Sequence, residues 1–199
     1  IEFGAGMGTV STLLLDHLDE LVLIEPSQRF VDGLKETFGN NEQVSIRKNS
    51  LEDFIGNCDD HSFDSAILIN VLEHIENDRS ALKDLNRILN PGGYLMIFVP
   101  ALKFLFSKMD VQLDHFRRYE MKELTNIVRA ADLEIISASF FDVLGVLPWW
   151  LINTKIGSTE FDPRLTRLYD RIGVPCTKFF ENIFSPAFGK NIFLIAKCN

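Results

Sequence analysis

An α/β fold with a parallel sheet covered by helices on both faces is predicted for this chain by two observations. Over the first 140 residues, short β-rich runs alternate with amphipathic helical runs, which is typical of parallel strands joined by crossover helices. A glycine-rich segment, Gly4-Ala5-Gly6-Met7-Gly8, lies between the first of these strands and the first helix. Glycines at such a turn let the backbone approach a ligand closely, and the following helix offers free N–H groups.

The individual elements follow from the same patterning. The fourth strand is a continuous apolar stretch, as expected of a central buried strand, and the helix after it carries apolar residues at helical spacing until Pro91-Gly92-Gly93 stops it. The predicted strands span residues 1–3, 20–24, 44–48, 64–70, 94–99, 133–141 and 191–197. The predicted helices span residues 9–18, 27–38, about 78–89 and 121–131.

Residues 142–190 interrupt this alternation. The segment holds four prolines and both tryptophans, and we predict an insertion packed over the carboxyl edge of the sheet. Within it a predicted helix runs from Asp162-Pro163 to Gly173 and has Leu165, Leu168, Tyr169 and Ile172 on one face. The apolar stretch 140–152 has three interpretations: core packing, a lid over a substrate, or contact with a membrane surface or partner. We predict one domain over residues 1–199. It begins at Ile1 with a strand shorter than the usual five or so residues, which indicates an N-terminal truncation.

Composition excludes several classes of protein. The chain has 20 Lys and Arg against 28 Asp and Glu, a formal net charge of −8, so a nucleic-acid partner is not expected. The three widely spaced cysteines have no zinc spacing and indicate reduced thiols in a cytoplasmic compartment. The sequence contains no run of about 18 apolar residues, so a membrane-spanning helix is not predicted.

An acidic residue supports the interpretation of the glycine loop. Glu25 directly follows the second predicted strand, where a carboxylate can accept hydrogen bonds from both hydroxyls of a ribose. A dinucleotide-binding fingerprint requires glycine where this chain has Thr9, and no second nucleotide-binding half follows. Glu25 as a carboxylate at a helix start, and Glu2 as a half-buried strand residue, remain the alternatives.

At this point the sequence resembles the class I S-adenosylmethionine-dependent methyltransferases, specifically a bacterial subgroup with small-molecule or glycan acceptors. The resemblance covers about residues 1–140, with the motifs in the order of that family. The segments that carry it are Glu2–Gly8, Leu23-Ile24-Glu25-Pro26, Ser62-Phe63-Asp64, Asn70-Val71-Leu72-Glu73-His74-Ile75 and Asn90-Pro91-Gly92-Gly93-Tyr94.

The resemblance implies a Rossmann-like seven-stranded sheet of order near 3-2-1-4-5-7-6 with the last strand antiparallel. It also implies S-adenosylmethionine as the cofactor, with Glu25 on the ribose and Glu2 orienting the amino group. Ser50 stands where the family has an acidic residue for the adenine, so that contact would fall to its hydroxyl and to the Leu51 N–H. The cofactor-binding residues implied in this way are Glu2, Gly4, Ala5, Gly6, Gly8, Glu25, Pro26, Ser50, Leu51, Asn70 and Val71.

Methyl transfer from a sulfonium needs alignment and, for a hydroxyl acceptor, a base, so neither a nucleophile triad nor a metal is expected. The candidate catalytic residues are His115, His74 and Tyr119, and the candidate acceptor-binding residues are Arg117, Arg118 and Trp149. For His115 the alternative is a helix-capping or Asp114-paired histidine, and for the arginines a solvated face or a pair with Asp110 or Glu120.

We therefore predict an enzyme that methylates a small-molecule or lipid- or glycan-linked acceptor, with oxygen favoured as the acceptor atom. The chain lacks the Asn/Asp-Pro-Pro-aromatic motif of amino-group methylases. The two rival interpretations are a non-catalytic S-adenosylmethionine-binding module and an NAD(P)-dependent oxidoreductase. Thr9 and the lack of a hydride-transfer set of residues oppose the second of these.

Overall fold

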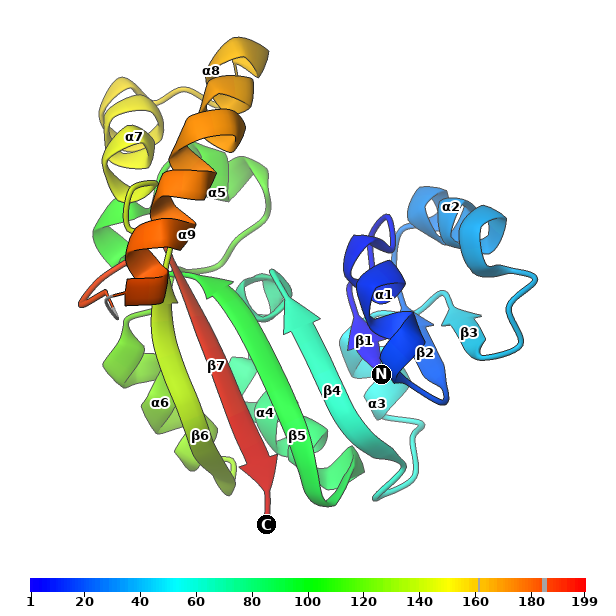
Figure 1. Cartoon of the computed structure of the whole chain (residues 1–199). Coiled ribbons are helices and arrows are strands. Elements are labelled where there is room, and N and C mark those ends of the chain that lie inside the picture. Colours follow the sequence, from blue (N-terminus) through cyan, green and yellow to red (C-terminus); the bar gives the residue numbers. More distant parts are fainter. Residues whose placement is uncertain (161, 184–185) are drawn as a thin grey trace.

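The computed structural model describes residues 1–160, 162–183 and 186–199. Within these residues seven strands form a single sheet of order β3-β2-β1-β4-β5-β7-β6, in which β7 is antiparallel to both of its neighbours (Figure 1). The predicted fold class and strand order are therefore confirmed. The strands are β1 (Glu2–Phe3), β2 (Leu21–Ile24), β3 (Val44–Arg47), β4 (Phe63–Ile69), β5 (Leu89–Pro100), β6 (Leu133–Phe141) and β7 (Asn191–Cys198).

Helices connect the strands and also lie in the segment at residues 142–190, here called the cap. The α-helices in the described residues are α1 (Thr9–Leu14), α2 (Gln28–Phe38), α3 (Leu51–Ile55), α4 (Asp78–Ile88), α5 (Lys108–Gln112), α6 (Met121–Arg129), α7 (Val146–Trp149), α8 (Pro163–Leu168) and α9 (Val174–Ile183). The 3-10 helices are η1 (Leu15–His17), η2 (Leu72–His74) and η3 (Lys103–Leu105), and η4 (Trp150–Ile156) and η5 (Tyr169–Gly173) are π-helical. None of the described helices combines the length and the apolar character needed to cross a bilayer.

The main core lies between the sheet and helices α3, α4 and α6. Helix α4 buries the apolar face that its spacing predicts, with Leu82, Leu85 and Ile88 fully covered, and the Asn77 side chain caps its first turn by accepting a hydrogen bond from the Ser80 N–H at 3.2 Å. A smaller cluster around α2 covers the opposite face near β1 and β2. Together these layers hold the carboxyl ends of β1, β2, β4 and β5 at one edge of the sheet.

Some element boundaries differ from the predicted ones. Strand β5 begins at Leu89, five residues before the predicted start, because Leu89 already pairs with Phe63 of β4. The next pair is Tyr94 with Ser65, and the residues between the two pairs, which include Pro91-Gly92-Gly93, shift the register. The helix after the glycine loop is α-helical only to Leu14 and continues as the 3-10 helix η1. The three cysteines are free, and Cys198 is buried at the end of β7.

The cap at residues 142–190 forms helices α7, α8 and α9, which gather at the carboxyl end of β5 and β6 (Figure 1). Asp162 caps α8 as predicted, since its carboxylate accepts the Arg164 N–H at 2.7 Å. The expected end of this helix is wrong, because the chain stays helical through Gly173 into α9. The apolar side chains of Leu165, Leu168 and Ile172 are 51%, 55% and 55% exposed.

Candidate active site

The glycine loop is held tightly between β1 and the end of β4. Gly4 and Gly8 have φ angles of +67° and +76°, which side chains rarely adopt. A Cβ atom on Gly4 would lie 2.5 Å from the Val71 side chain, and one on Gly8 would lie 2.5 Å from the Phe38 ring. Glycine at these two positions therefore permits the turn and its close packing.

Glu25 ties the loop to the end of β2. Its two carboxylate oxygens accept hydrogen bonds from the backbone N–H groups of Gly6 and Ser27, at 2.9 and 2.8 Å. The side chain is buried, yet each oxygen keeps a second lone pair for a ligand. Glu25 therefore both shapes the loop and faces the space in front of it.

A cavity of about 500 Å³, here called the glycine-loop cavity, lies in front of the loop. Eight of the predicted cofactor-binding residues line it, and Phe30, Asn49 and Glu52 are among the others. Ser50 also caps α3 by accepting the Asp53 N–H at 3.1 Å. The eight are Gly4, Gly6, Glu25, Pro26, Ser50, Leu51, Asn70 and Val71.

Three predicted cofactor-binding residues do not line this cavity. Ala5 packs into the small core cluster and Gly8 begins α1. Glu2 is buried and accepts a hydrogen bond from the Ser11 hydroxyl at 2.6 Å. Burial raises the pKa of Glu2 above its usual range, although the hydroxyl acts in the other direction. Ala5 and Gly8 are thus packing positions of the loop itself, and Glu2 supports the loop from β1 through Ser11.

A second cavity, of about 400 Å³, lies beside the first at the carboxyl ends of β4 and β5 and is here called the histidine cavity. Asn70 and His74 line both cavities, so the two spaces meet there. Asn70 ends β4 with a φ of +53°, a conformation that asparagine tolerates better than most residues. The histidine cavity is lined by Asn70, His74, Phe98, Pro100, Leu113, His115, Arg118, Trp149, Lys190 and Asn191.

His115 is oriented by a buried carboxylate. Its Nδ1 lies 3.1 Å from Asp110 Oδ1, and the same oxygen accepts a hydrogen bond from Arg118 Nε at 2.8 Å. The backbone N–H and hydroxyl of Ser107 both donate to the other oxygen, each at 2.9 Å. Burial would raise the pKa of Asp110, but these donors hold it below its usual range. The ionised carboxylate keeps the proton of His115 on Nδ1 and leaves the Nε2 lone pair free.

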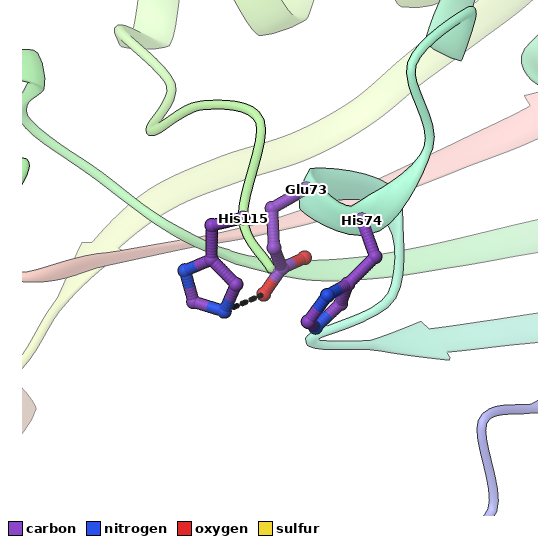
Figure 2. A group of neighbouring side chains, drawn as sticks. All are labelled: Glu73, His74 and His115. Carbon is purple, nitrogen blue, oxygen red and sulfur yellow. Dashed lines mark ion pairs between the residues drawn. The ribbon is translucent and has the colours of Figure 1, made fainter. Parts of the chain in front are cut away.

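Figure 2 shows the carboxylate of Glu73 between the rings of His115 and His74. Glu73 Oε1 lies 4.0 Å from His115 Nε2, and the two rings are 4.7 Å apart in an edge-to-face contact. Burial raises the pKa of Glu73 to about 8. Burial, together with the neighbouring His115, lowers the pKa of His74. The cluster thus places two imidazoles and a carboxyl group where the cavities meet.

Tyr119, a predicted base, has a structural role instead. Its ring is fully buried, and its hydroxyl lies 2.9 Å from Asp78 Oδ2 and 3.2 Å from the Leu72 carbonyl oxygen, both of which can accept its proton. Burial and the adjacent Asp78 carboxylate raise the pKa of Tyr119 above that of an ordinary tyrosine. The backbone bridge between Ala101 and Tyr119 directs this side chain into the core. Tyr119 is therefore removed from the candidate bases.

The two arginines differ in position. Arg117 lies outside both cavities, where it pairs with Asp78 at 2.8 Å and donates to the Glu76 carbonyl, so it is removed from the acceptor-binding residues. Arg118 pairs with Asp110, as one alternative interpretation proposed, and also lines the histidine cavity. Its guanidinium stacks 4.5 Å from the centre of the Trp149 ring.

Sequence patterns predict no site role for three residues of this region. Glu73 is predicted only as part of a motif, although an acidic residue next to Leu72, just after a central strand, is an unusual signal. Asp110 forms a capping box with Ser107. A serine followed three positions later by an acidic residue is a sequence pattern that predicts this motif. Lys190, the last residue of the cap in the chain, also lines the cavity, and no local pattern indicates this position.

Residues 1–97 match the family model of a methyltransferase domain. An uncharacterized methyltransferase of Schizosaccharomyces pombe is 28% identical over 109 residues, which cover 48% of this chain and 37% of that protein. The mitochondrial ubiquinone biosynthesis O-methyltransferase of Dictyostelium discoideum is 22% identical over 164 residues, covering 71% of this chain and 47% of that protein. This chain thus spans half or less of the length of these relatives.

A solved structure agrees with the fold over nearly the whole chain. The S-adenosylmethionine-dependent methyltransferase of Mesorhizobium loti superposes with a TM-score of 0.68 at 12% identity, covering 98% of this chain and 89% of that one. At this identity the likeness concerns the fold alone. Residues 1–97 are therefore similar to a methyltransferase domain, and the described fold is similar to that of a solved S-adenosylmethionine-dependent methyltransferase.

Proposed function

We propose that this chain transfers the methyl group of S-adenosylmethionine to a hydroxyl oxygen of an acceptor held in the histidine cavity. The observation that carries the proposal is the junction of the two cavities at Asn70 and His74. Both volumes, about 400 and 500 Å³, lie in the range of small-molecule sites, roughly 300–1,000 Å³. A methyl group carried at the junction would face a hydroxyl across a short gap, which in-line displacement requires.

The glycine-loop cavity would hold the cofactor. Glu25 has lone pairs left for the ribose hydroxyls, and Gly4 and Gly6 allow the methionine portion to lie against the backbone. Ser50 and the N–H of Leu51, the first residue of α3, are available for the adenine. Glu2 would act on the amino group only indirectly, because it lies behind the loop.

The reaction needs only a proton acceptor and alignment from the protein. When bound, S-adenosylmethionine would supply an electrophilic methyl group, and its transfer to the acceptor oxygen would release S-adenosylhomocysteine, a neutral thioether. His115 Nε2 is free to take the hydroxyl proton, and the ionised Asp110 stabilises the imidazolium that forms. This arrangement supports an oxygen acceptor.

The lining of the histidine cavity supports an acceptor with an apolar or aromatic portion. Phe98, Leu113 and Trp149 form one part of its wall. Arg118 and Lys190 also line it, but each is paired with a carboxylate, Asp110 and Asp142 respectively. We propose that Trp149 and Arg118 contact the acceptor, and that residues 142–190 act as the acceptor-side cap.

The cap also supports a lipid-linked acceptor. Arg164, Arg167 and Arg171 are exposed on α8 and η5, beside the exposed Leu165, Leu168 and Ile172. Basic and apolar residues interleaved on a projecting helix suit the surface of an anionic membrane, although the whole chain has a net charge of −8. We therefore propose that the acceptor is presented at a membrane surface on the side of the cap.

Calorimetric titration with S-adenosylhomocysteine tests the cofactor, with NAD and NADP run in parallel. The proposal predicts saturable binding of S-adenosylhomocysteine alone, and loss of binding in Glu25→Ala. Preference for a nicotinamide nucleotide, or no binding of S-adenosylhomocysteine, would overturn it. Binding without methylation of any phenol, catechol or lipid-linked sugar would favour the non-catalytic module.

Co-sedimentation with vesicles tests the presentation of the acceptor. Binding to vesicles of phosphatidylcholine and phosphatidylglycerol, but not of phosphatidylcholine alone, is the expected result. Loss of binding is expected when the three cap arginines are replaced by glutamine. A matched control replaces three exposed arginines outside the cap, and equal loss in both variants would contradict the proposal. The cap set is Arg164, Arg167 and Arg171, and the control set is Arg29, Arg47 and Arg79.

A further inference from the structure

Three side chains with metal-ligating atoms come together at the edge of the histidine cavity. One donor atom from each of Glu73, His74 and His115 lies within 4.8 Å of the other two (Figure 2). Glu73 and His74 come from η2, directly after β4, and His115 comes from the loop after α5. Segments about 40 residues apart in the chain are therefore required to assemble the group.

Glu73 is the unusual member of this cluster. Its side chain is 0% exposed, and neither of its carboxylate oxygens has a hydrogen-bond partner among the described residues. The nearest ring nitrogen of the cluster that can form an ion pair with it is His115 Nε2, at 4.0 Å. A buried carboxylate without a partner is costly, so native proteins normally satisfy it with a donor or a cation. The carboxylate points to the space between the two imidazoles (Figure 2).

His115 is oriented as a metal ligand usually is. It is held through Nδ1 by the buried Asp110, at 3.1 Å, and its Nε2 faces Glu73. The His74 ring contacts the His115 ring edge to face, with the ring centres 4.7 Å apart. Ligating histidines typically donate their other ring N–H to a carboxylate or a backbone carbonyl, which fixes the tautomer and the ring plane. The cluster therefore holds a ligand set together with the groups that orient it.

We propose that Glu73, His74 and His115 bind one divalent transition-metal cation, with open coordination positions towards the histidine cavity. Two imidazoles and one carboxylate suit Zn²⁺, Mn²⁺, Fe²⁺ or Co²⁺, whereas Mg²⁺ prefers oxygen ligands alone. Metal–ligand bonds of about 2.0–2.2 Å require the three atoms to move closer together. His74 is exposed, so its ring has room to rotate towards the other two donors.

This inference rests on the proposed function and deepens it. A cation at the cavity edge would coordinate the acceptor hydroxyl oxygen and lower its pKa, so that the proton leaves to solvent. The oxygen–methyl bond then forms as the carbon–sulfur bond breaks, with the sulfonium released as a thioether. In this state His115 Nε2 is a ligand, and the cation rather than the imidazole activates the acceptor. The proposed metal site replaces the sequence-based expectation that the reaction needs no metal.

Spectroscopic titration of the tag-free, chelator-treated chain with Co²⁺ tests the site without cofactor or acceptor. The proposal predicts visible absorption that saturates at one Co²⁺ per chain, is displaced by Zn²⁺ and is unaffected by Mg²⁺. His115→Ala and Glu73→Gln are each expected to weaken Co²⁺ binding by about tenfold or more, as loss of a ligand should at least match loss of an orienting group. His17→Ala, at an exposed histidine outside the cluster, is the matched control and should bind as the unmodified chain does.

His74→Ala keeps the test decisive if a buried substitution prevents folding, because His74 is exposed. Absence of saturable Co²⁺ binding would overturn the proposal, and so would binding that survives in His74→Ala and His115→Ala. Titration with S-adenosylhomocysteine on the same samples separates the two ideas. Retained S-adenosylhomocysteine binding without Co²⁺ binding would reject the metal site alone, whereas loss of both would also count against the proposed cofactor cavity.

Discussion

The glycine-loop cavity and the histidine cavity meet at Asn70 and His74, yet they are assembled in different ways. The glycine-loop cavity takes its residues from turns that directly follow β1, β2, β3 and β4. The histidine cavity combines the ends of β4 and β5 with loop residues 113–118, the cap and the start of β7. One cavity is local to the strand ends, and the other depends on segments that only the tertiary fold brings together.

This difference suggests a division of roles. Residues of the glycine-loop cavity are held by backbone hydrogen bonds and close packing, as at Glu25 and Gly4, which suits an invariant ligand. The histidine cavity is lined by side chains from a cap whose apolar helix face is exposed. Substitutions in one cavity should therefore affect cofactor binding, and substitutions in the other should affect methyl transfer.

The largest effect is expected in the histidine cavity. His115→Ala should lower methyl transfer by about 10²–10⁴-fold, because it removes the group proposed to receive the hydroxyl proton or to hold the cation. S-adenosylhomocysteine affinity should stay unchanged, since His115 does not line the glycine-loop cavity. The measurement is the initial rate on acceptors from a panel of phenols, catechols and lipid-linked sugars. An unchanged rate would show that this imidazole has no part in the reaction.

The reverse pattern is expected for Glu25→Ala. Loss of two charge-assisted backbone contacts and of the ribose contact should weaken S-adenosylhomocysteine binding by about 100-fold, equivalent to about 3 kcal/mol. Co²⁺ binding at the Glu73 cluster should be retained, because Glu25 touches none of its three residues. Parallel calorimetry and cobalt spectroscopy measure both effects, and a joint loss would mean that the two cavities are not independent.

Tyr119→Phe should affect stability rather than chemistry. The variant removes a buried hydroxyl that bonds to Asp78 and Leu72, which should lower the free energy of unfolding by about 1 kcal/mol. Asp78 keeps its ion pair with Arg117, which limits the loss. Urea denaturation measures the change, and a loss of methyl transfer without loss of stability would restore Tyr119 as a catalytic candidate.

The smallest effect is a pH dependence at Glu2. Because burial raises the pKa of Glu2 in the folded chain, the folded state holds this proton more tightly than the unfolded state. Its contribution to stability is therefore complete below the usual carboxyl pKa, about 4.3, and is lost as the pH rises through the raised value. Glu2→Gln should remove this decline. Urea denaturation of both proteins between about pH 4 and pH 8 compares them, and identical profiles would contradict the burial effect.

Several site residues were predictable because short patterns encode them. A glycine loop between a strand and a helix, and an acidic residue at the end of the next strand, locate Gly4, Gly6 and Glu25 whatever the rest of the chain does. The continuous apolar stretch that predicts β4 also places Asn70 directly after Ile69, the last residue of the strand. These residues depend on local geometry, and the structure brings them to one cavity.

The loop at residues 113–119 shows where local patterns stop. Its histidine, arginines and tyrosine were all candidates, because a loop has no periodicity that says which way a side chain points. The bridge between Ala101 and Tyr119 sends Tyr119 into the core, while its neighbour Arg118 turns to Asp110. The direction of each of these side chains therefore depends on contacts with residues distant in the chain.

The amino-acid sequence alone determined the alternation of strands and helices, the glycine loop and Glu25, because strand and turn patterns act over a few residues. The sheet order was implied only by the family resemblance. Only the tertiary structure decided the pairing of His115 with Asp110 and its approach to Glu73. Glu73 and His115 lie 42 positions apart, and their contact depends on how β4, α5 and the cap pack. Contacts of that kind arise from the burial of the whole core, which no short segment specifies.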